Sequence, residues 1–152
     1  MTLNYFDTLL RARKGYARVL EPICKKWQIT RNELDVLLFL ANNPGMDRAV
    51  DIVNGRGLSK SHVSFSVNAL QSRGFLTRLE NRSDRRTIHL VLTQSARPIV
   101  EAGQAAQRQF FCGIFAGVSR EEMAVWRQIT EKVSANIQAL EPRQNQPESM
   151  RP

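Results

Sequence analysis

The sequence has few of the residues that build catalytic or metal centres. Its 152 residues include only two histidines, His62 and His89, and two cysteines, Cys24 and Cys112. The cysteines fit neither a metal-binding nor a CxxC spacing, and the histidines fit a polar helix face and a strand better than a ligand set. A glycine-rich phosphate loop and a pair of carboxylates beside a histidine are also missing. These absences argue against an enzyme and predict no cofactor and no metal site.

Long apolar runs are absent as well. No stretch is long and apolar enough to span a bilayer. The first residues, MTLNYFDTLLRARKGY, lack the charged start, apolar run and small-residue cleavage site of a signal peptide. We therefore expect a cytoplasmic protein with no membrane partner. The length fits one domain, which would bury about 70% of the surface of the unfolded chain.

Acidic residues are outnumbered, and the imbalance is local. The formal net charge is +8. Residues 56–86 form the most basic block, with seven Lys and Arg side chains against two acidic ones. A basic patch on a small domain favours a polyanionic partner, and nucleic acid before a membrane surface.

The first half of the chain predicts four helices. Apolar residues recur at helical spacing over 3–27, where Pro22 should kink or divide the helix. Thr30 with Glu33 forms a capping box before a largely apolar helix over 31–43. Asp47 is placed to cap a short third helix.

A turn framed by Gly55 and Gly57 should precede the fourth helix. Ser59 can cap that helix, which should stop at Gly74. At 100° per residue, its residues divide into two faces. The inner face holds Val63, Ser66, Val67 and Leu70. The outer face and its flanks carry no acid and hold Ser61, His62, Ser64, Phe65, Asn68 and Ser72. Short polar groups of this kind suit a base-reading surface better than an ordinary solvated helix face, which would carry Glu–Lys pairs.

Two short runs of strand composition, FLTRLE and TIHLVL, follow this helix. Their connector, NRSDRR, holds Arg82, Arg85 and Arg86 around Asp84. A turn this basic can reach phosphates or a narrow minor groove. On charge alone, a solvated loop is an equally good interpretation.

The last third predicts two helices and a tail. Thr93 begins the first helix, and Pro98 falls in its opening turns, where proline does least harm. Ser119 with Glu122 forms a second capping box before 120–140. An apolar seam at spacings of three or four follows, suited to packing on another helix within or between chains. Its members are Met123, Trp126, Ile129, Val133, Ile137 and Leu140. Residues 141–152 have no apolar periodicity and are expected to be a flexible tail.

Taken in order, these pieces resemble the MarR family of bacterial transcriptional regulators. ITRNELDVLLFL resembles the family's "Leu-Thr-x-x-Glu" helix. DIVNGRGLSKSHVSFSVNALQSRGFLTR resembles its helix-turn-helix with "Gly-Leu-Ile-x-Arg", and DRRTIHLVLT resembles its wing. The resemblance spans about residues 29–98 and rests on the order of the pieces. The turn NGRG is slightly longer than the family's usual turn.

The resemblance implies a mainly α fold with a small β-hairpin wing. Residues 1–28 and 94–140 would form a helical dimerisation region, and residues 29–93 a winged helix-turn-helix. A homodimer would bind double-stranded DNA at a pseudo-palindromic site. Arg86 would enter the minor groove, braced by an ion pair with Asp84, and Lys60 would meet phosphate. The residues expected to face the major groove are Ser61, His62, Ser64, Phe65 and Asn68.

One residue departs from the family pattern. Where the family often has Arg or Lys on the recognition helix, this chain has Phe65. Phenylalanine cannot donate a bidentate pair to guanine, but it can contact a thymine methyl group or lie against a partner helix. The base preference of relatives therefore does not transfer to this chain.

The sequence favours a dimeric transcriptional regulator, a repressor released by a small-molecule or oxidative signal. The alternative is a ligand-binding or stress-sensing homodimer with weak or vestigial DNA binding. Family members often bind small aromatic acids, and the candidate lining here is Arg13, Tyr16, Trp27 and Phe110, although the aromatic rings fit a core equally well. Metal sensing is disfavoured because residues 99–111 contain no histidine. Reduced, partly buried thiols are the simplest interpretation of Cys24 and Cys112, and a peroxide-sensing thiol is the alternative.

Overall fold

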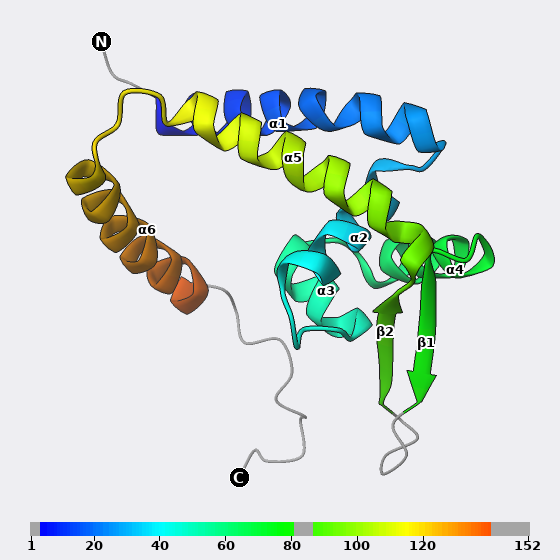
Figure 1. The fold of residues 1–152 in the computed structure, drawn as a ribbon. Coiled ribbons are helices and arrows are strands. Elements are labelled where there is room, and N and C mark those ends of the chain that lie inside the picture. Colours follow the sequence, from blue (N-terminus) through cyan, green and yellow to red (C-terminus); the bar gives the residue numbers. More distant parts are fainter. Residues whose placement is uncertain (1–3, 81–86, 141–152) are drawn as a thin grey trace, which may run out of the picture. The chain divides into compact units, whose positions relative to one another are not determined.

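The computed structural model describes residues 4–80 and 87–140, apart from the side chain of Tyr5. The described chain is mainly helical with one two-stranded hairpin, as predicted (Figure 1). It divides into two compact units, one ending at Ile114 and one beginning at Phe115, and each is considered by itself. The elements are α1 (Tyr5–Trp27), α2 (Arg31–Asn42), α3 (Ala49–Arg56), α4 (Lys60–Ser72), β1 (Leu76–Glu80), β2 (Ile88–Leu92), the 3-10 turn η1 (Gln94–Ala96), α5 (Arg97–Ile114) and α6 (Arg120–Leu140).

Helix α2 contributes most to the core of the first unit. It buries a continuous apolar run, as its sequence predicted, and packs against α4, α5, α3, β2 and α1. Burying this many aliphatic side chains is the dominant favourable term for folding. The α2 members of the core are Leu34, Val36, Leu37, Leu38 and Phe39. The other elements add Leu20, Ile23, Ile52, Val63, Val67, Leu70, Leu76, Leu90, Ile99 and Val100.

Helix ends follow the predicted caps in three places. Thr30 and Glu33 exchange both bonds of a capping box, with distances of 3.2 Å and 2.8 Å. Ser59 Oγ accepts from the backbone N–H of His62 at 3.2 Å. The box of Ser119 and Glu122 is also present. Local side-chain chemistry therefore sets where α2, α4 and α6 begin.

The predicted role of Asp47 is wrong. The residue that caps α3 is Arg48, whose backbone N–H donates to the carboxylate of Asp51 at 3.0 Å. Asp47 lies one position earlier, and its carboxylate reaches His89 on β2. An aspartate before a short helix resembles a cap in sequence. Here a partner 42 residues away takes the carboxylate instead.

The prediction for Gly55 also needs correction, and of the two effects expected from Pro22, the division of the helix does not occur. Helix α1 runs undivided through Pro22 to Trp27. Gly55 lies inside α3, and an added Cβ there would collide with the ring of Phe39. Only Gly57, with φ +63°, takes the left-handed conformation that ends the helix. Most of the NGRG stretch is therefore helix, and the turn before α4 is shorter than the sequence suggested.

Strands β1 and β2 pair antiparallel in a register that aligns Leu76 with Leu92 and Arg78 with Leu90. Leu76 and Leu90 are buried and anchor the base of the hairpin, whereas Ile88 is 43% exposed. The backbone N–H of Leu90 also donates to the carbonyl of Asp47 at 2.7 Å. This bond fixes β2 to the loop before α3.

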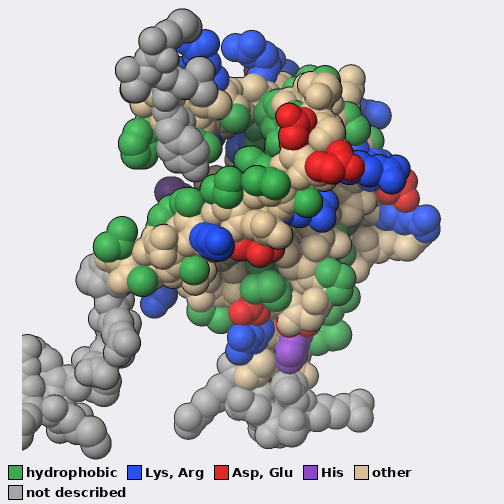
Figure 2. Space-filling view, turned by 90° about the vertical axis from the view of Figure 1, so that its left-hand side faces the viewer, with side chains coloured by type: hydrophobic (Ala, Val, Ile, Leu, Met, Phe, Trp, Pro, Cys, Tyr) green, Lys and Arg blue, Asp and Glu red, His purple; other side chains and the backbone are tan. Residues whose placement is uncertain are grey.

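In the second unit, α6 keeps its apolar seam largely uncovered. Phe115 packs edge-on against Trp126, with ring centroids 5.0 Å apart. Beyond it, the seam residues from Trp126 to Leu140 are between 38% and 83% exposed. Exposed hydrophobic side chains appear as green areas in Figure 2. Among the described residues, no helix has the length and apolar character needed to cross a membrane.

Candidate nucleic-acid interface

Helix α4 has the two faces that its sequence predicted. All four residues of the expected inner face are buried, and the expected outer-face residues are all exposed. Phe65 stands at the centre of the outer face with 71% of its surface open to solvent. An aromatic ring this exposed on a well-anchored helix is available for contact with another molecule.

The N-terminal end of α4 suits an anionic partner. Ser59 caps the helix, and its hydroxyl lies 2.9 Å from that of Ser61. The first turn contains no acidic residue and begins with the exposed Lys60. The partial positive charge of a helix N-terminus adds to that cation.

Arg78 is a further candidate residue, which the sequence did not single out. It projects from β1, and its Nη2 donates to Oδ1 of Asn68 on α4 at 2.6 Å. Both side chains are exposed. The only signal in the sequence was a cation inside a strand, in the position of the arginine of the family's "Gly-Leu-Ile-x-Arg" pattern. The pairing with Asn68 requires the fold.

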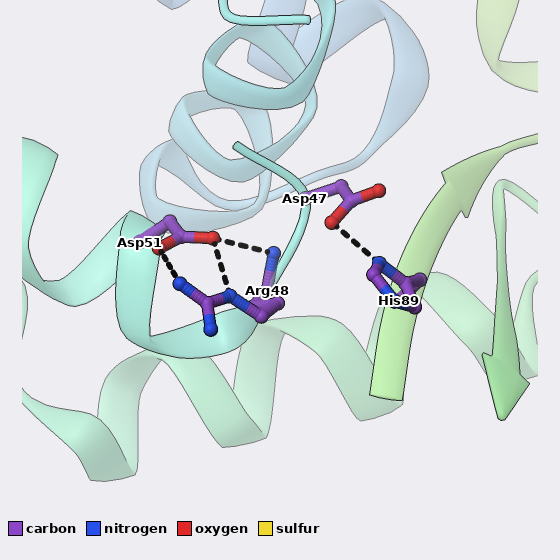
Figure 3. A network of polar contacts seen from close by, with 4 residues as sticks. All are labelled: Asp47, Arg48, Asp51 and His89. Atoms are coloured by element: carbon purple, nitrogen blue, oxygen red, sulfur yellow. Dashed lines mark hydrogen bonds and ion pairs between the residues drawn. The ribbon is translucent and has the colours of Figure 1, made fainter. Parts of the chain in front are cut away.

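A second polar group holds the hairpin to the loop before α3 (Figure 3). Nδ1 of His89 lies 2.7 Å from Oδ1 of Asp47. Beside them, the guanidinium of Arg48 binds Asp51 through two bonds of 3.1 Å and 3.0 Å. Hydrogen bonding from Arg48 is the main reason why the pKa of Asp51 is lowered. The pair of His89 and Asp47 braces the hairpin, and the pair of Arg48 and Asp51 holds the first turn of α3 beside it.

A hollow of about 470 Å³ lies between α3, α4 and the hairpin. Its wall is mostly aliphatic, and Lys60, Ser64 and Arg78 are its polar members. No acidic side chain is among the described residues that line it. The wing side of α4 therefore presents cations and a hydroxyl next to apolar surface.

The predicted wing residues Arg82, Asp84, Arg85 and Arg86 lie outside the described residues, between Glu80 and Thr87. Their expected roles remain predictions from the motif.

The four candidate effector residues lie on α1 and α5. Tyr16 and Phe110 pack with ring centroids 5.5 Å apart, and the Tyr16 hydroxyl accepts from Gln107 at 2.6 Å. Arg13 is exposed on α1. Trp27 lies 11 residues beyond Tyr16, or about 16 Å along the helix at 1.5 Å per residue. The ammonium group of Lys26 lies 4.5 Å from the centre of the Trp27 ring.

A different hollow, of about 460 Å³, lies where α1 meets the start of α2. Lys14, Arg18 and Arg31 give it a positive lining, with Glu21 as its acid and Cys24 also in the wall. Burial is the main reason why the pKa of Cys24 is raised, which disfavours the reactive thiolate. Cys112 is exposed on α5. Among the described residues, no group of three or more His, Cys, Asp or Glu side chains could hold a metal ion.

The arrangement of α3 and α4 followed by the β1–β2 hairpin defines a winged helix-turn-helix. The family model described as "MarR family" matches residues 27–87. Residues 27–87, which hold most of the winged helix-turn-helix, thus match the MarR family. Members of this family are transcription regulators.

Individual comparisons agree with the family. An uncharacterised HTH-type transcriptional regulator of Bacillus subtilis, YwhA, is 31% identical over 84 residues, which cover 55% of this chain and 60% of YwhA. The solved structure of transcriptional regulator PA3341 is 24% identical with a TM-score of 0.77, covering 89% of this chain and 99% of that one.

A third protein of similar structure is regulated by a small molecule. The Bordetella bronchiseptica regulator BpsR has a TM-score of 0.66 at 22% identity, covering 88% of this chain and 95% of that one. The structure of BpsR was solved to explain how 6-hydroxynicotinic acid regulates its DNA binding. At these identities, the two solved structures bear on the fold alone.

Proposed function

We propose that this protein is a homodimeric repressor that binds a pseudo-palindromic DNA site in the cytoplasm and is released by a small-molecule or oxidative signal. The observation that carries the proposal is the outer face of α4, which is exposed, free of acid and centred on Phe65. Such a face fits the major groove, where short polar side chains bond to base edges and an apolar ring can touch a thymine methyl group. Lys60 and the basic wing would hold the backbone phosphates.

The first experiment selects bound DNA from a random pool. A dimer of this fold should return two half-sites whose centres are about 10 base pairs apart. Affinity for the best site should then fall steeply with salt, because several phosphates are neutralised. A flat salt response and no consensus would favour a ligand-binding or stress-sensing homodimer with vestigial DNA binding.

The wing is tested by Arg86→Ala. Loss of a minor-groove arginine should weaken DNA binding by about 1–3 kcal/mol without changing the oligomeric state. Arg127→Ala on α6 removes a cation outside the winged helix and should leave affinity unchanged. Equal affinities for Arg86→Ala and the unsubstituted protein would count against the wing assignment.

The dimer proposal rests on the exposed seam of α6. A helix with an uncovered apolar stripe is stabilised when a partner covers it. Val133→Lys places a charge on that stripe, whereas Glu131→Lys places the same side chain on the opposite side of the helix. Light scattering should show a monomer for the first variant and a dimer for the second. If both variants are dimers, α6 does not form the interface.

For the signal, we propose a small aromatic acid before an oxidant. Three cations line the hollow on α1, and a regulator of similar fold responds to 6-hydroxynicotinic acid. Tyr16, Phe110, Arg13 and Trp27 remain the alternative lining. By binding preferentially to a conformation that misfits DNA, the ligand would shift the population away from the bound form.

The two signals are separated by adding salicylate, 6-hydroxynicotinic acid or peroxide to the DNA complexes of the unsubstituted protein and of four variants. Arg18→Ala should abolish the response to the acids, and Arg13→Ala should not. Cys24→Ser should leave the response to the acids intact. If peroxide alone releases DNA, and Cys24→Ser or Cys112→Ser prevents it, the oxidative signal is the correct one.

A further inference from the structure

Asn68 and Arg78 form a side-chain pair on the wing side of α4. Nη2 of Arg78 donates to Oδ1 of Asn68 at 2.6 Å, from a strand to a helix. The hairpin fixes the backbone of Arg78, because this residue pairs with the buried Leu90 across the sheet. Both side chains are exposed, so the pair is presented to a partner rather than used in the core.

This bond changes what Asn68 offers. A free carboxamide has an acceptor oxygen beside a donor NH2 group, which is why asparagine can read adenine by two bonds. In this structure, Oδ1 already accepts one bond from the guanidinium of Arg78. The NH2 group of Asn68 takes no part in this bond and keeps its two donors.

Together the two side chains present donors. Arg78 has five N–H donors, one of which bonds Asn68, and Asn68 has two, whereas the acceptor of the pair, Oδ1, already accepts from the guanidinium. Arg78 also lines the hollow next to Lys60 and Ser64, where no described lining residue is acidic. A base that offers acceptors to this pair would be bound, whereas a base that offers an amino group would face mainly donors.

The major-groove edges of the bases differ in this respect. Guanine presents two acceptors, N7 and O6, whereas adenine replaces one of them with an amino donor, and cytosine presents an amino donor. Asn68 stands three residues after Phe65, on the outer face of α4. With α4 in the groove, this face is the one that meets base edges.

We propose that Arg78 and Asn68 act as one base-reading pair that selects guanine over adenine in each half-site. This inference rests on the proposed function, because it assumes that α4 enters the major groove. The strand residue supplies the cation that the outer face of α4 lacks at Phe65, and the asparagine fixes its position.

The test starts from the DNA site selected by the unsubstituted protein. One G·C pair in each half-site should be required, and changing it to A·T should lower affinity by roughly tenfold to a hundredfold. Arg78→Met keeps the length of the side chain and removes its donors. It should reduce that preference to about twofold or less, and Asn68→Ala should do the same at the same base pair. The double variant should lose no more than either single variant, because coupled residues are not additive.

Lys60→Met is the matched control, since Lys60 is expected to bind phosphate. It should weaken binding to all sequences alike and lower the salt dependence, while the G·C preference stays. The same contact can also be tested by changing the DNA instead of the protein. Replacing the selected guanine with 7-deazaguanine removes the N7 acceptor, which should weaken binding of the unsubstituted protein and leave Arg78→Met unaffected.

The outcomes separate this inference from the proposed function. If Arg78→Met behaves like Lys60→Met, Arg78 binds phosphate and the base-reading pair is wrong, but the regulator stands. The same holds if the G·C preference survives in both Arg78→Met and Asn68→Ala. If the unsubstituted protein selects no sequence at all, the proposed function fails and this inference fails with it.

Discussion

The imidazole of His89 lies 2.7 Å from the carboxylate of Asp47, and this pair joins β2 to the loop before α3. The backbone of Asp47 accepts a further bond from Leu90 at 2.7 Å. One loop residue therefore holds two successive residues of the strand. Figure 3 shows both side chains of the pair turned toward each other.

Loss of this pair should loosen the hairpin. His89→Ala and Asp47→Ala should each lower the free energy of unfolding by about 0.5–1.5 kcal/mol, the usual net value of one hydrogen bond. The double variant should cost less than the sum of the two, because both changes remove the same contact. Urea denaturation of the four proteins measures this, and strict additivity would mean that the two residues act independently.

Close packing of α5 on α2 makes Gly103 sensitive to substitution. An added Cβ would lie 2.7 Å from Cδ2 of the buried Leu38. Gly103→Ala should therefore destabilise the fold by about 1–3 kcal/mol. Gly113→Ala on the same helix is the control, since nothing lies within 4 Å of its added Cβ. This variant should raise the free energy of unfolding by up to about 1 kcal/mol. Equal denaturation midpoints would contradict the close contact.

Arg73 ties the end of α4 to the end of α1. Its Nη1 and Nη2 donate to the carbonyls of Gln28 and Trp27, respectively, both at 2.7 Å. Arg73→Met should lower stability by about 1–3 kcal/mol, since both bonds involve a charged donor. Arg127→Met removes an exposed arginine of α6 and should change stability by less than about 0.5 kcal/mol. Thermal melting of the two variants compares them directly.

Acid should weaken the cap of α3. The pKa of Asp51 is lowered in the fold, mainly by its hydrogen bond to Arg48. A carboxyl whose pKa falls on folding stabilises the native state above its unfolded pKa, and this contribution disappears as the pH drops through the folded pKa. Stability should thus decline from pH 5 toward pH 2, and Asp51→Asn should flatten part of that decline. An unchanged pH profile in the variant would mean that the ion pair adds nothing.

Features encoded within a few residues were predictable. The capping boxes of Thr30 and Ser119, the two faces of α4 and both strands follow from local chemistry and periodicity. Errors arose where a distant residue decided the outcome. In sequence Asp47 resembles a helix cap, but its carboxylate binds the distant His89. Gly55 resembles a turn residue, but it lies in a helix and packs against the ring of Phe39. Arg78 was missed for the same reason, because its partner lies on another element.

The bonds from Arg73 to Gln28 and Trp27 have a consequence for the length of the DNA site. They join the last turn of the recognition helix to the last turn of α1. Whatever sets the position of α1 thereby sets the position of α4. In a dimer assembled through α1, the packing of the two α1 helices would determine the distance between the two α4 helices. A movement of α1 would then appear as a change in the preferred number of base pairs between half-sites.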